Sequence, residues 1–379
     1  MDHKPLPIVF AALVVSKKNF LTLRMALEGG MEPFAPTPRT LSLITTFRCT
    51  AACAACCFGC SPRAKRDAMS LRRMRHYIDT VLAAFGGSLQ VVVFTGGECF
   101  LLGVKLRLAV AYASSKGLVT RVVTNGYWAA SEKRALRVLR MLQRCGLREV
   151  NFSTGASHQQ WVPQERVVNG CVAAARLGMT CVVNVEQHGL EDNGYQRFVE
   201  DGRIAELINR QEDGALRAPF MVMAGVWMEP AREGGESNLP VIALTPEKGC
   251  DTLFDSLTLA PTGELYACCG LTARGNSHLK ERLPRYPSVE DLRAAWERLA
   301  EDFLLLWLYA EGAVTIYREC LRRNAGAQRI DGMHSCAVCR LLFQEENLAQ
   351  LRTTYQPYRA RVFQLCALRQ RMLYEEKKG

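Results

Sequence analysis

Short apolar runs alternate with longer amphipathic stretches from residue 41 onward. Runs of strand length between segments of helical periodicity are typical of βα units. The predicted strands are 41–46, 89–94, 120–123, 149–153, 180–185 and 219–224, and the predicted helices between them are 70–85, 102–116, 131–145, 165–177 and 195–209. Six successive units predict a parallel sheet with right-handed crossovers, closed or partly closed into a barrel.

The pattern changes after a segment rich in glycine, glutamate and serine at 231–238, where we place a domain boundary. Beyond it we predict a hairpin at 257–267 that turns at Pro261-Thr262-Gly263, a long helix at 289–323 and a final helix at 356–376. The expected organisation is an N-terminal extension (1–40), an α/β barrel (41–230) and a small α+β module (240–379).

The composition, with 379 residues, 49% hydrophobic and 22% charged, is that of a soluble globular protein. The longest apolar stretch, 6–15, is too short to span a bilayer and is followed by no small-residue cleavage site. We therefore expect an N-terminal helix over the main domain rather than a signal peptide, and no membrane association. The 16 cysteines are clustered, which favours metal binding in a reducing compartment, the cytoplasm, over disulfides.

The formal charge of +11 fits a nucleic-acid partner, an acidic peptide partner or only a basic surface. The sequence has no dense Lys/Arg tract with interleaved aromatic residues. We therefore expect no nucleic-acid partner.

Five cysteines lie within the twelve residues 49–60, directly after the first predicted strand. Cys49, Cys53 and Cys56 have the spacing C-x3-C-x2-C, with which three thiolates can wrap one face of a [4Fe–4S] cube and leave one iron without a protein ligand. That iron can chelate the methionine moiety of S-adenosylmethionine (SAM), and reduction then releases a 5′-deoxyadenosyl radical.

Two alternatives to this ligand set remain. The cysteines Cys53, Cys57 and Cys60 repeat the same spacing, but the first register begins at the barrel mouth, where loops hold functional groups. A structural zinc site normally takes four ligands in two separated pairs, so a tight run of three fits zinc less well.

Further candidate residues for the SAM site follow the predicted strands. Gly96-Gly97-Glu98 ends the second strand, where glycines let the backbone approach a ligand closely. Softer candidates for SAM contacts at the same mouth are Asn125, Ser153 and Asn184, each of which could instead cap a helix or close a turn. His158 also follows a strand and could contact substrate, although such a histidine is more often structural.

A second cysteine set lies in the C-terminal module. Cys250, Cys268, Cys336 and Cys339 make a plausible four-thiolate site for an auxiliary iron–sulfur cluster, with structural zinc as the alternative. Cys269 follows Cys268 on a predicted strand, so its side chain is expected on the opposite face. There it could donate a hydrogen atom to a carbon radical, or it could be a small buried residue.

These motifs resemble the radical SAM superfamily, and C-x12-G-x4-C with a distant C-x2-C resembles the truncated SPASM module called twitch. More closely, the chain resembles the epipeptide-type peptide epimerases, which convert L-residues of a ribosomal precursor peptide to D-residues. The similar stretches occur in order at 49–62, 94–101, 124–128, 250–270 and 335–343. Two departures are Gly155, where the family tends to have an acidic residue, and residues 1–40, which match nothing and are too few for a winged-helix peptide-recognition domain.

The resemblance implies a partial (β/α)6 radical SAM barrel with a twitch-like module, in which Cys49, Cys53 and Cys56 bind the SAM cluster and Cys268 an auxiliary [4Fe–4S] cluster. It implies epimerisation of a ribosomal precursor peptide, with Cys269 as the hydrogen donor and an electron donor such as flavodoxin or ferredoxin. The competing interpretations are a radical SAM enzyme that forms a thioether or carbon–carbon cross-link, and a non-catalytic cysteine-rich metal protein.

Overall fold

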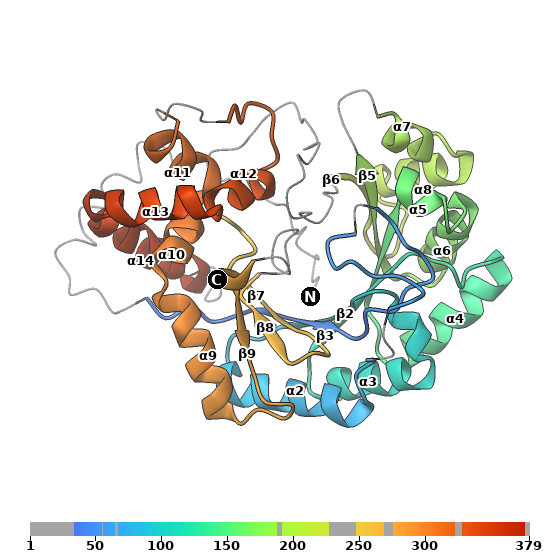
Figure 1. Cartoon of the computed structure of the whole chain (residues 1–379). Coiled ribbons are helices and arrows are strands. Elements are labelled where there is room, and N and C mark those ends of the chain that lie inside the picture. The colour runs from blue at the N-terminus through green and yellow to red at the C-terminus, as the bar shows by residue number, and fades with distance from the viewer. Residues whose placement is uncertain are drawn as a thin grey trace.

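A single curved sheet organises the molecule (Figure 1). The computed structural model describes residues 34–54, 56–64, 67–187, 192–226, 248–268, 276–322 and 328–375. The predicted N-terminal helix and the predicted boundary at 231–238 lie outside these residues, as does Cys269. The nine strands have the order β6-β5-β4-β3-β2-β1-β7-β8-β9.

The six predicted barrel strands all form, and each pairs in parallel with its neighbour in sequence. They are β1 (Thr40–Ile44), β2 (Val91–Thr95), β3 (Val119–Thr124), β4 (Glu149–Thr154), β5 (Thr180–Gln187) and β6 (Phe220–Val226). Strands β1 and β2 are buried along most of their length, whereas β3 and β4 alternate apolar with polar or less buried residues. Because β6 and β9 are the two ends of the strand order, the barrel is partial, as predicted.

The helices between the strands cover one side of the sheet (Figure 1). They are α2 (Leu71–Phe85), α3 (Val104–Ser115), α4 (Glu132–Arg144), α5 (Ala156–Gln159), α6 (Gln164–Arg176), α7 (Gly194–Val199) and α8 (Gly202–Glu212), with the 3-10 helix η1 (Cys99–Leu102) after β2. Ser70 and Ser131 cap α2 and α4 with their side chains. The single helix predicted at 195–209 is wrong, because Asp201 caps the start of α8 and divides the segment.

The predicted hairpin forms as β7 (Ser256–Leu259) and β8 (Glu264–Tyr266), which pair antiparallel. It is not a separate sheet, because β7 pairs in parallel with β1. A third strand, β9 (Lys280–Arg282), follows the short 3-10 helix η2 (Ser277–Leu279) and completes this edge.

The C-terminal helices pack beyond this edge of the sheet (Figure 1). They are α9 (Val289–Glu301), α10 (Phe303–Ala310), α11 (Gly312–Cys320), α12 (Ser335–Leu342), α13 (Glu345–Thr354) and α14 (Arg359–Glu375), with η3 (Gln356–Tyr358) before the last. The single helix predicted at 289–323 is wrong: Asp302 caps the start of α10, and Gly312 has a φ of 80° at the start of α11.

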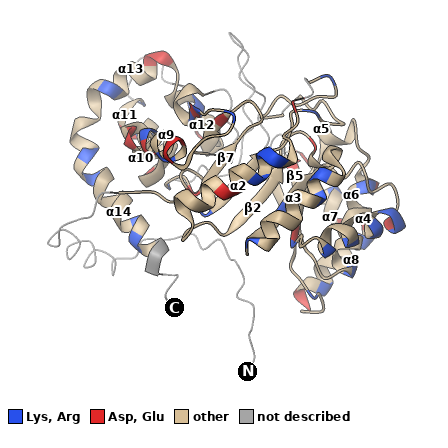
Figure 2. Ribbon diagram, turned by 90° about the horizontal axis from the view of Figure 1, so that it is seen from below, with Lys and Arg blue, Asp and Glu red and all other residues tan. Residues whose placement is uncertain are grey.

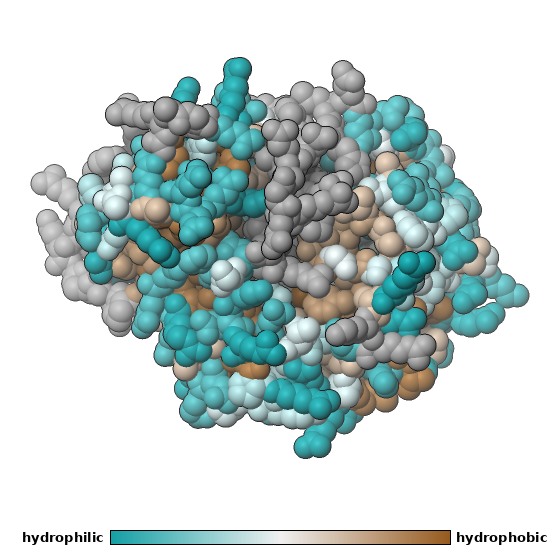
Figure 3. Space-filling model, in the orientation of Figure 1, coloured by the Kyte–Doolittle hydropathy of each residue, from teal (hydrophilic) through white to brown (hydrophobic). Residues whose placement is uncertain are grey.

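The surface of the molecule is mainly hydrophilic on the face in Figure 3. Smaller groups of apolar residues lie among the hydrophilic residues that cover most of the described surface there. Among the described residues, no helix has the length and apolar character needed to cross a membrane.

Candidate active site

The cysteine loop after β1 is folded back on itself. The backbone N–H of Cys49 donates to the carbonyl of Ser61 at 3.2 Å, which joins the two ends of the loop. Inside it, Cys56 donates to the carbonyl of Cys53 at 3.2 Å, and Gly59 donates to that of Cys56 at 2.9 Å. These turns hold the five cysteines in a compact arrangement, although the described residues of the segment lie in no helix or strand.

The glycine pair after β2 lies directly against this loop. A Cβ on Gly97 would lie 2.1 Å from the carbonyl oxygen of Arg48, so only glycine fits there. Gly97 donates to the carbonyl of Thr46 at 2.7 Å, and Glu98 donates to that of Arg48 at 2.9 Å. The loops after β1 and β2 are therefore joined backbone to backbone.

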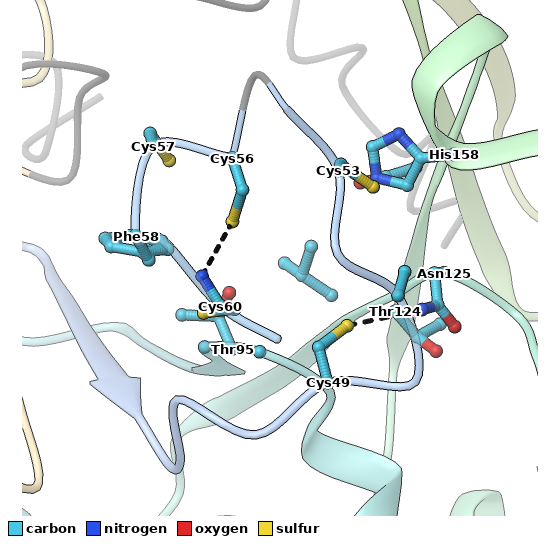
Figure 4. Close-up of a pocket in the computed structure, with 15 residues that line it drawn as sticks. Cys49, Cys53, Cys56, Cys57, Phe58, Cys60, Thr95, Thr124, Asn125 and His158 are labelled. Atoms are coloured by element: carbon cyan, nitrogen blue, oxygen red, sulfur yellow. Dashed lines mark hydrogen bonds between the residues drawn. The ribbon is translucent and has the colours of Figure 1, made fainter. Parts of the chain in front are cut away.

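A pocket opens between these loops and the ends of the neighbouring strands (Figure 4). Its lining includes all five cysteines of the loop together with Gly96, Gly97, Asn125, Ser153 and His158. Of the residues predicted to contact SAM, Glu98 and Asn184 are not among those that line it. Asn184 instead packs against Gly225 on β6, and its buried Oδ1 has no hydrogen-bond partner among the described residues.

The three predicted ligand thiols differ in their electrostatics. Burial raises the pKa of Cys49 to about 11 and that of Cys53 to about 12. Cys56 has its pKa lowered to about 6, because the Cys60 side chain and the Cys60 N–H, which lies 3.3 Å from the Cys56 Sγ, stabilise its thiolate. The pKa of Cys60 is raised by this contact and by burial.

This donor set fits an iron–sulfur cluster. Two of the thiols keep their protons at neutral pH unless a nearby cation stabilises the thiolates, which is what metal coordination does. Among the described residues, no three Cys, His, Asp or Glu side chains are arranged to hold a single metal ion. A cube binds its thiolates at separate iron corners, so cluster ligation does not need three sulfurs at one point. Cys60 is buried, and its backbone N–H donates to the Cys56 sulfur.

The carboxylate of Glu98 faces the protein interior and accepts hydrogen bonds there. Its side chain is 0% exposed, and its carboxylate accepts hydrogen bonds from Phe100 N, Thr124 Oγ1 and Asn125 N, all at 3.0 Å. Burial raises the pKa of Glu98 to about 7, against the lowering effect of these bonds. The carboxylate thus fastens the end of β2 to the end of β3.

A buried His–Glu pair was not predicted from the sequence. His158 Nδ1 lies 2.6 Å from Glu186 Oε2, and the two side chains are 8% and 0% exposed. The Ser157 N–H also donates to Glu186. Gly155, at φ 126°, leaves the space for this carboxylate, because a Cβ there would lie 2.0 Å from Glu186 Cγ. The carboxylate beside His158 therefore comes from β5, and nothing in the local sequence of β5 indicates it.

The structure brings two of the four C-terminal cysteines together. The hydroxyl of Thr252 lies 3.5 Å from Cys250 Sγ and 3.6 Å from Cys268 Sγ. Cys336 and Cys339 are both half-buried on α12, three residues apart and hence on one face of the helix. The auxiliary cluster on all four residues stays a prediction.

A parallel partial barrel with a C-x3-C-x2-C loop at the carboxyl ends of its strands is the arrangement that the resemblance to the radical SAM superfamily implies. No family model matches the chain. It is 26% identical over 329 residues to YydG of Bacillus subtilis (strain 168), a protein named for peptide biosynthesis, covering 84% of this chain and 96% of YydG.

Similar solved structures include a histidine-tagged form of anSMEcpe with bound AdoMet (TM-score 0.47, 12% identity, 84% of this chain and 98% of that one). Another is BtrN in complex with AdoMet and 2-DOIA (TM-score 0.39, 12% identity, 72% of this chain and 88% of that one).

Proposed function

We propose that this protein is a radical SAM enzyme of peptide biosynthesis that converts L-residues of a ribosomally made peptide to D-residues. The observation that carries the proposal is the pocket in which Cys49, Cys53 and Cys56 face the glycine pair Gly96-Gly97 at the carboxyl ends of parallel strands. The similarity to YydG, which covers nearly all of that protein, supports a peptide as the substrate.

In this proposal Cys49, Cys53 and Cys56 hold a [4Fe–4S] cluster, and the Gly96-Gly97 backbone lies close enough to the pocket to bind SAM. Together, the bound cluster and SAM supply the 5′-deoxyadenosyl radical. Cys250, Cys268, Cys336 and Cys339 hold the auxiliary cluster. Asn125 and Ser153 line the same pocket and are further candidates for SAM contacts.

The inversion itself needs two groups on opposite faces of the substrate carbon. Removal of the α-hydrogen from one face leaves a planar carbon radical, and Cys269 returns a hydrogen atom to the other face. The S–H bond breaks as the new C–H bond forms, which leaves a sulfur radical on Cys269. One electron and one proton restore the thiol, and a flavodoxin- or ferredoxin-type carrier supplies the electron.

The partners follow from the same proposal. A precursor peptide occupies the open side of the pocket, and the reductant reaches the cluster from solvent. Figure 2 shows Lys and Arg gathered along α2, α3 and α4, in keeping with the formal charge of +11. Such a surface speeds association with acidic partners. We place the reaction in the cytoplasm, where the clustered thiols stay reduced.

The proposal is tested by turnover in D2O with SAM, a reductant and the precursor peptide encoded beside the gene. Epimerisation adds one deuterium per inverted residue with no other change in mass. In Cys269→Ala the deuterium incorporation is expected to stop, while Cys145→Ser, changed at the remote end of α4, incorporates it as the wild type does.

Other outcomes would contradict the epimerase assignment. A product that loses two hydrogen atoms indicates a cross-linking enzyme, and normal deuterium incorporation by Cys269→Ala excludes this thiol as the donor. Tightly bound zinc with no deoxyadenosine formation indicates a non-catalytic metal protein.

A further inference from the structure

The side chain of Asn125, at the end of β3, points at the sulfur of a predicted cluster ligand. Asn125 Nδ2 lies 3.6 Å from Cys49 Sγ (Figure 4) and 3.0 Å from Thr50 Oγ1. On sequence grounds this residue is a candidate SAM contact. Its geometry gives it a different partner within the same pocket.

The direction of the amide is fixed by its other end. Asn125 Oδ1 accepts the backbone N–H of Tyr127 at 3.1 Å, and a backbone N–H can only donate. The oxygen is therefore on the Tyr127 side, and the NH2 group faces Cys49.

The backbone of Asn125 is held by Glu98. Its N–H donates to Glu98 Oε2 at 3.0 Å, and the hydroxyl of Thr124 donates to the same carboxylate at 3.0 Å. Trp128 Nε1 donates to that hydroxyl, also at 3.0 Å. Glu98, Thr124, Asn125 and Trp128 are 0%, 2%, 6% and 4% exposed. The donor is therefore fixed by a buried network and cannot turn away without breaking it.

We propose that Asn125 donates a hydrogen bond to the Cys49 ligand sulfur, that Glu98 positions it to do so, and that the pair raises the reduction potential of the SAM cluster. This inference rests on the proposed function. The physical reason is that the reduced cluster carries one more negative charge than the oxidised cluster, so an N–H donor at a ligand sulfur stabilises the reduced form more.

The test is an anaerobic redox titration of the reconstituted cluster, followed by electron paramagnetic resonance in the absence of SAM. Asn125→Ala is expected to shift the midpoint potential to a more negative value. Asn125→Asp keeps the shape of the side chain but replaces the donor with a carboxylate, so the shift is larger. Glu98→Gln shifts the potential in the same direction by a smaller amount.

Cys145→Ser is the control, because Cys145 lies at the end of α4 and does not line the pocket, and its potential is expected to equal that of the wild type. Iron and sulfide analysis establishes that each variant carries its cluster. Equal potentials in the wild type and Asn125→Asp would overturn the inference, as would an unchanged potential combined with a loss of SAM affinity. A wild-type protein that takes up no [4Fe–4S] cluster would overturn the proposed function itself.

Discussion

The buried carboxylate of Glu98 links the end of β2 to the end of β3. The run Gly96-Gly97-Glu98 indicates a ligand-binding loop, and the two glycines do line the pocket. The carboxylate of Glu98 turns inward instead, because three donors at the ends of β2 and β3 converge on it. The three-residue run does not indicate in which direction the side chain of its last member points.

Replacing Glu98 by Ala is expected to lower the free energy of unfolding by about 1–3 kcal/mol or more, because it leaves buried donors without an acceptor. Denaturant titration measures this change. Glu206→Gln, on the exposed side of α8 where Glu206 lies 3.9 Å from Arg210, is the control and is expected to change stability very little. A Glu98→Ala protein as stable as the wild type would contradict the buried network.

The raised pKa of Glu98 also makes a prediction about pH. Its pKa is about 7 in the folded protein against an ordinary value of 4.5, so the folded state binds more protons between these values. The contribution of Glu98 to stability is therefore complete below pH 4.5 and is lost as the pH rises toward 7. The glutamine of the Glu98→Gln variant does not titrate, so the wild type is expected to lose stability relative to this variant as the pH rises from 4.5 to 7. A wild type that gains stability relative to the variant over this interval would contradict the raised pKa.

At the scale of elements, the strands were predictable because they are short apolar-rich runs between longer amphipathic stretches, and the hairpin because its turn sequence is explicit. The helix predictions were wrong where a cap interrupts an amphipathic pattern, as at Asp201 and Asp302. The His158–Glu186 pair could not be predicted at all. The pair depends on the register of β4 against β5, in which Thr154 lies opposite Val185, and a single sequence does not fix that register.

Gly155 and Glu186 are predicted to be energetically coupled. Gly155→Ala places a Cβ against the Glu186 side chain at a φ of 126°, and Glu186→Ala removes a buried hydrogen-bonding carboxylate, so each is destabilising. The double variant is expected to be less destabilised than the sum of the two, because the steric clash is gone. Denaturation midpoints of all four proteins give the coupling. Additive effects would contradict the contact.

The backbone contact between the loops after β1 and β2 can be tested by replacing two glycines with alanine. Gly97→Ala puts a Cβ 2.1 Å from the Arg48 carbonyl oxygen, so the cysteine loop must move and the iron content after anaerobic reconstitution is expected to fall several-fold. Gly87→Ala is the matched control, because nothing lies within 4 Å of the added Cβ. Equal iron content in the two variants would show that this backbone contact does not position the cysteine loop.

At the scale of the whole molecule, the sheet connects the two parts that the sequence suggested. Strand β1 lies between β2 and β7, with Ser42 Oγ 3.3 Å from Ser256 Oγ. The sequence indicated a separate module because the βα rhythm stops near residue 230. It could not indicate that the next strand returns to β1, since that pairing joins residues more than two hundred positions apart.

A chain that ends at residue 230 is therefore expected not to fold independently. Removal of β7 exposes the edge of β1 and the apolar side chains Leu41 and Leu43, both 0% exposed in the whole protein. Solubility and limited proteolysis measure the outcome, with the full chain as the control. A soluble, protease-resistant fragment would show that the barrel is an independent domain.

The central claim is that the loop after β1 binds the cluster that activates SAM, and deoxyadenosine formation by paired cysteine variants tests it most directly. Cys49 belongs only to the first register and Cys57 only to the overlapping one. After anaerobic reconstitution and reduction, Cys57→Ala is predicted to form 5′-deoxyadenosine from SAM and Cys49→Ala to form none. Formation by Cys49→Ala, or none by the wild type, would contradict the account.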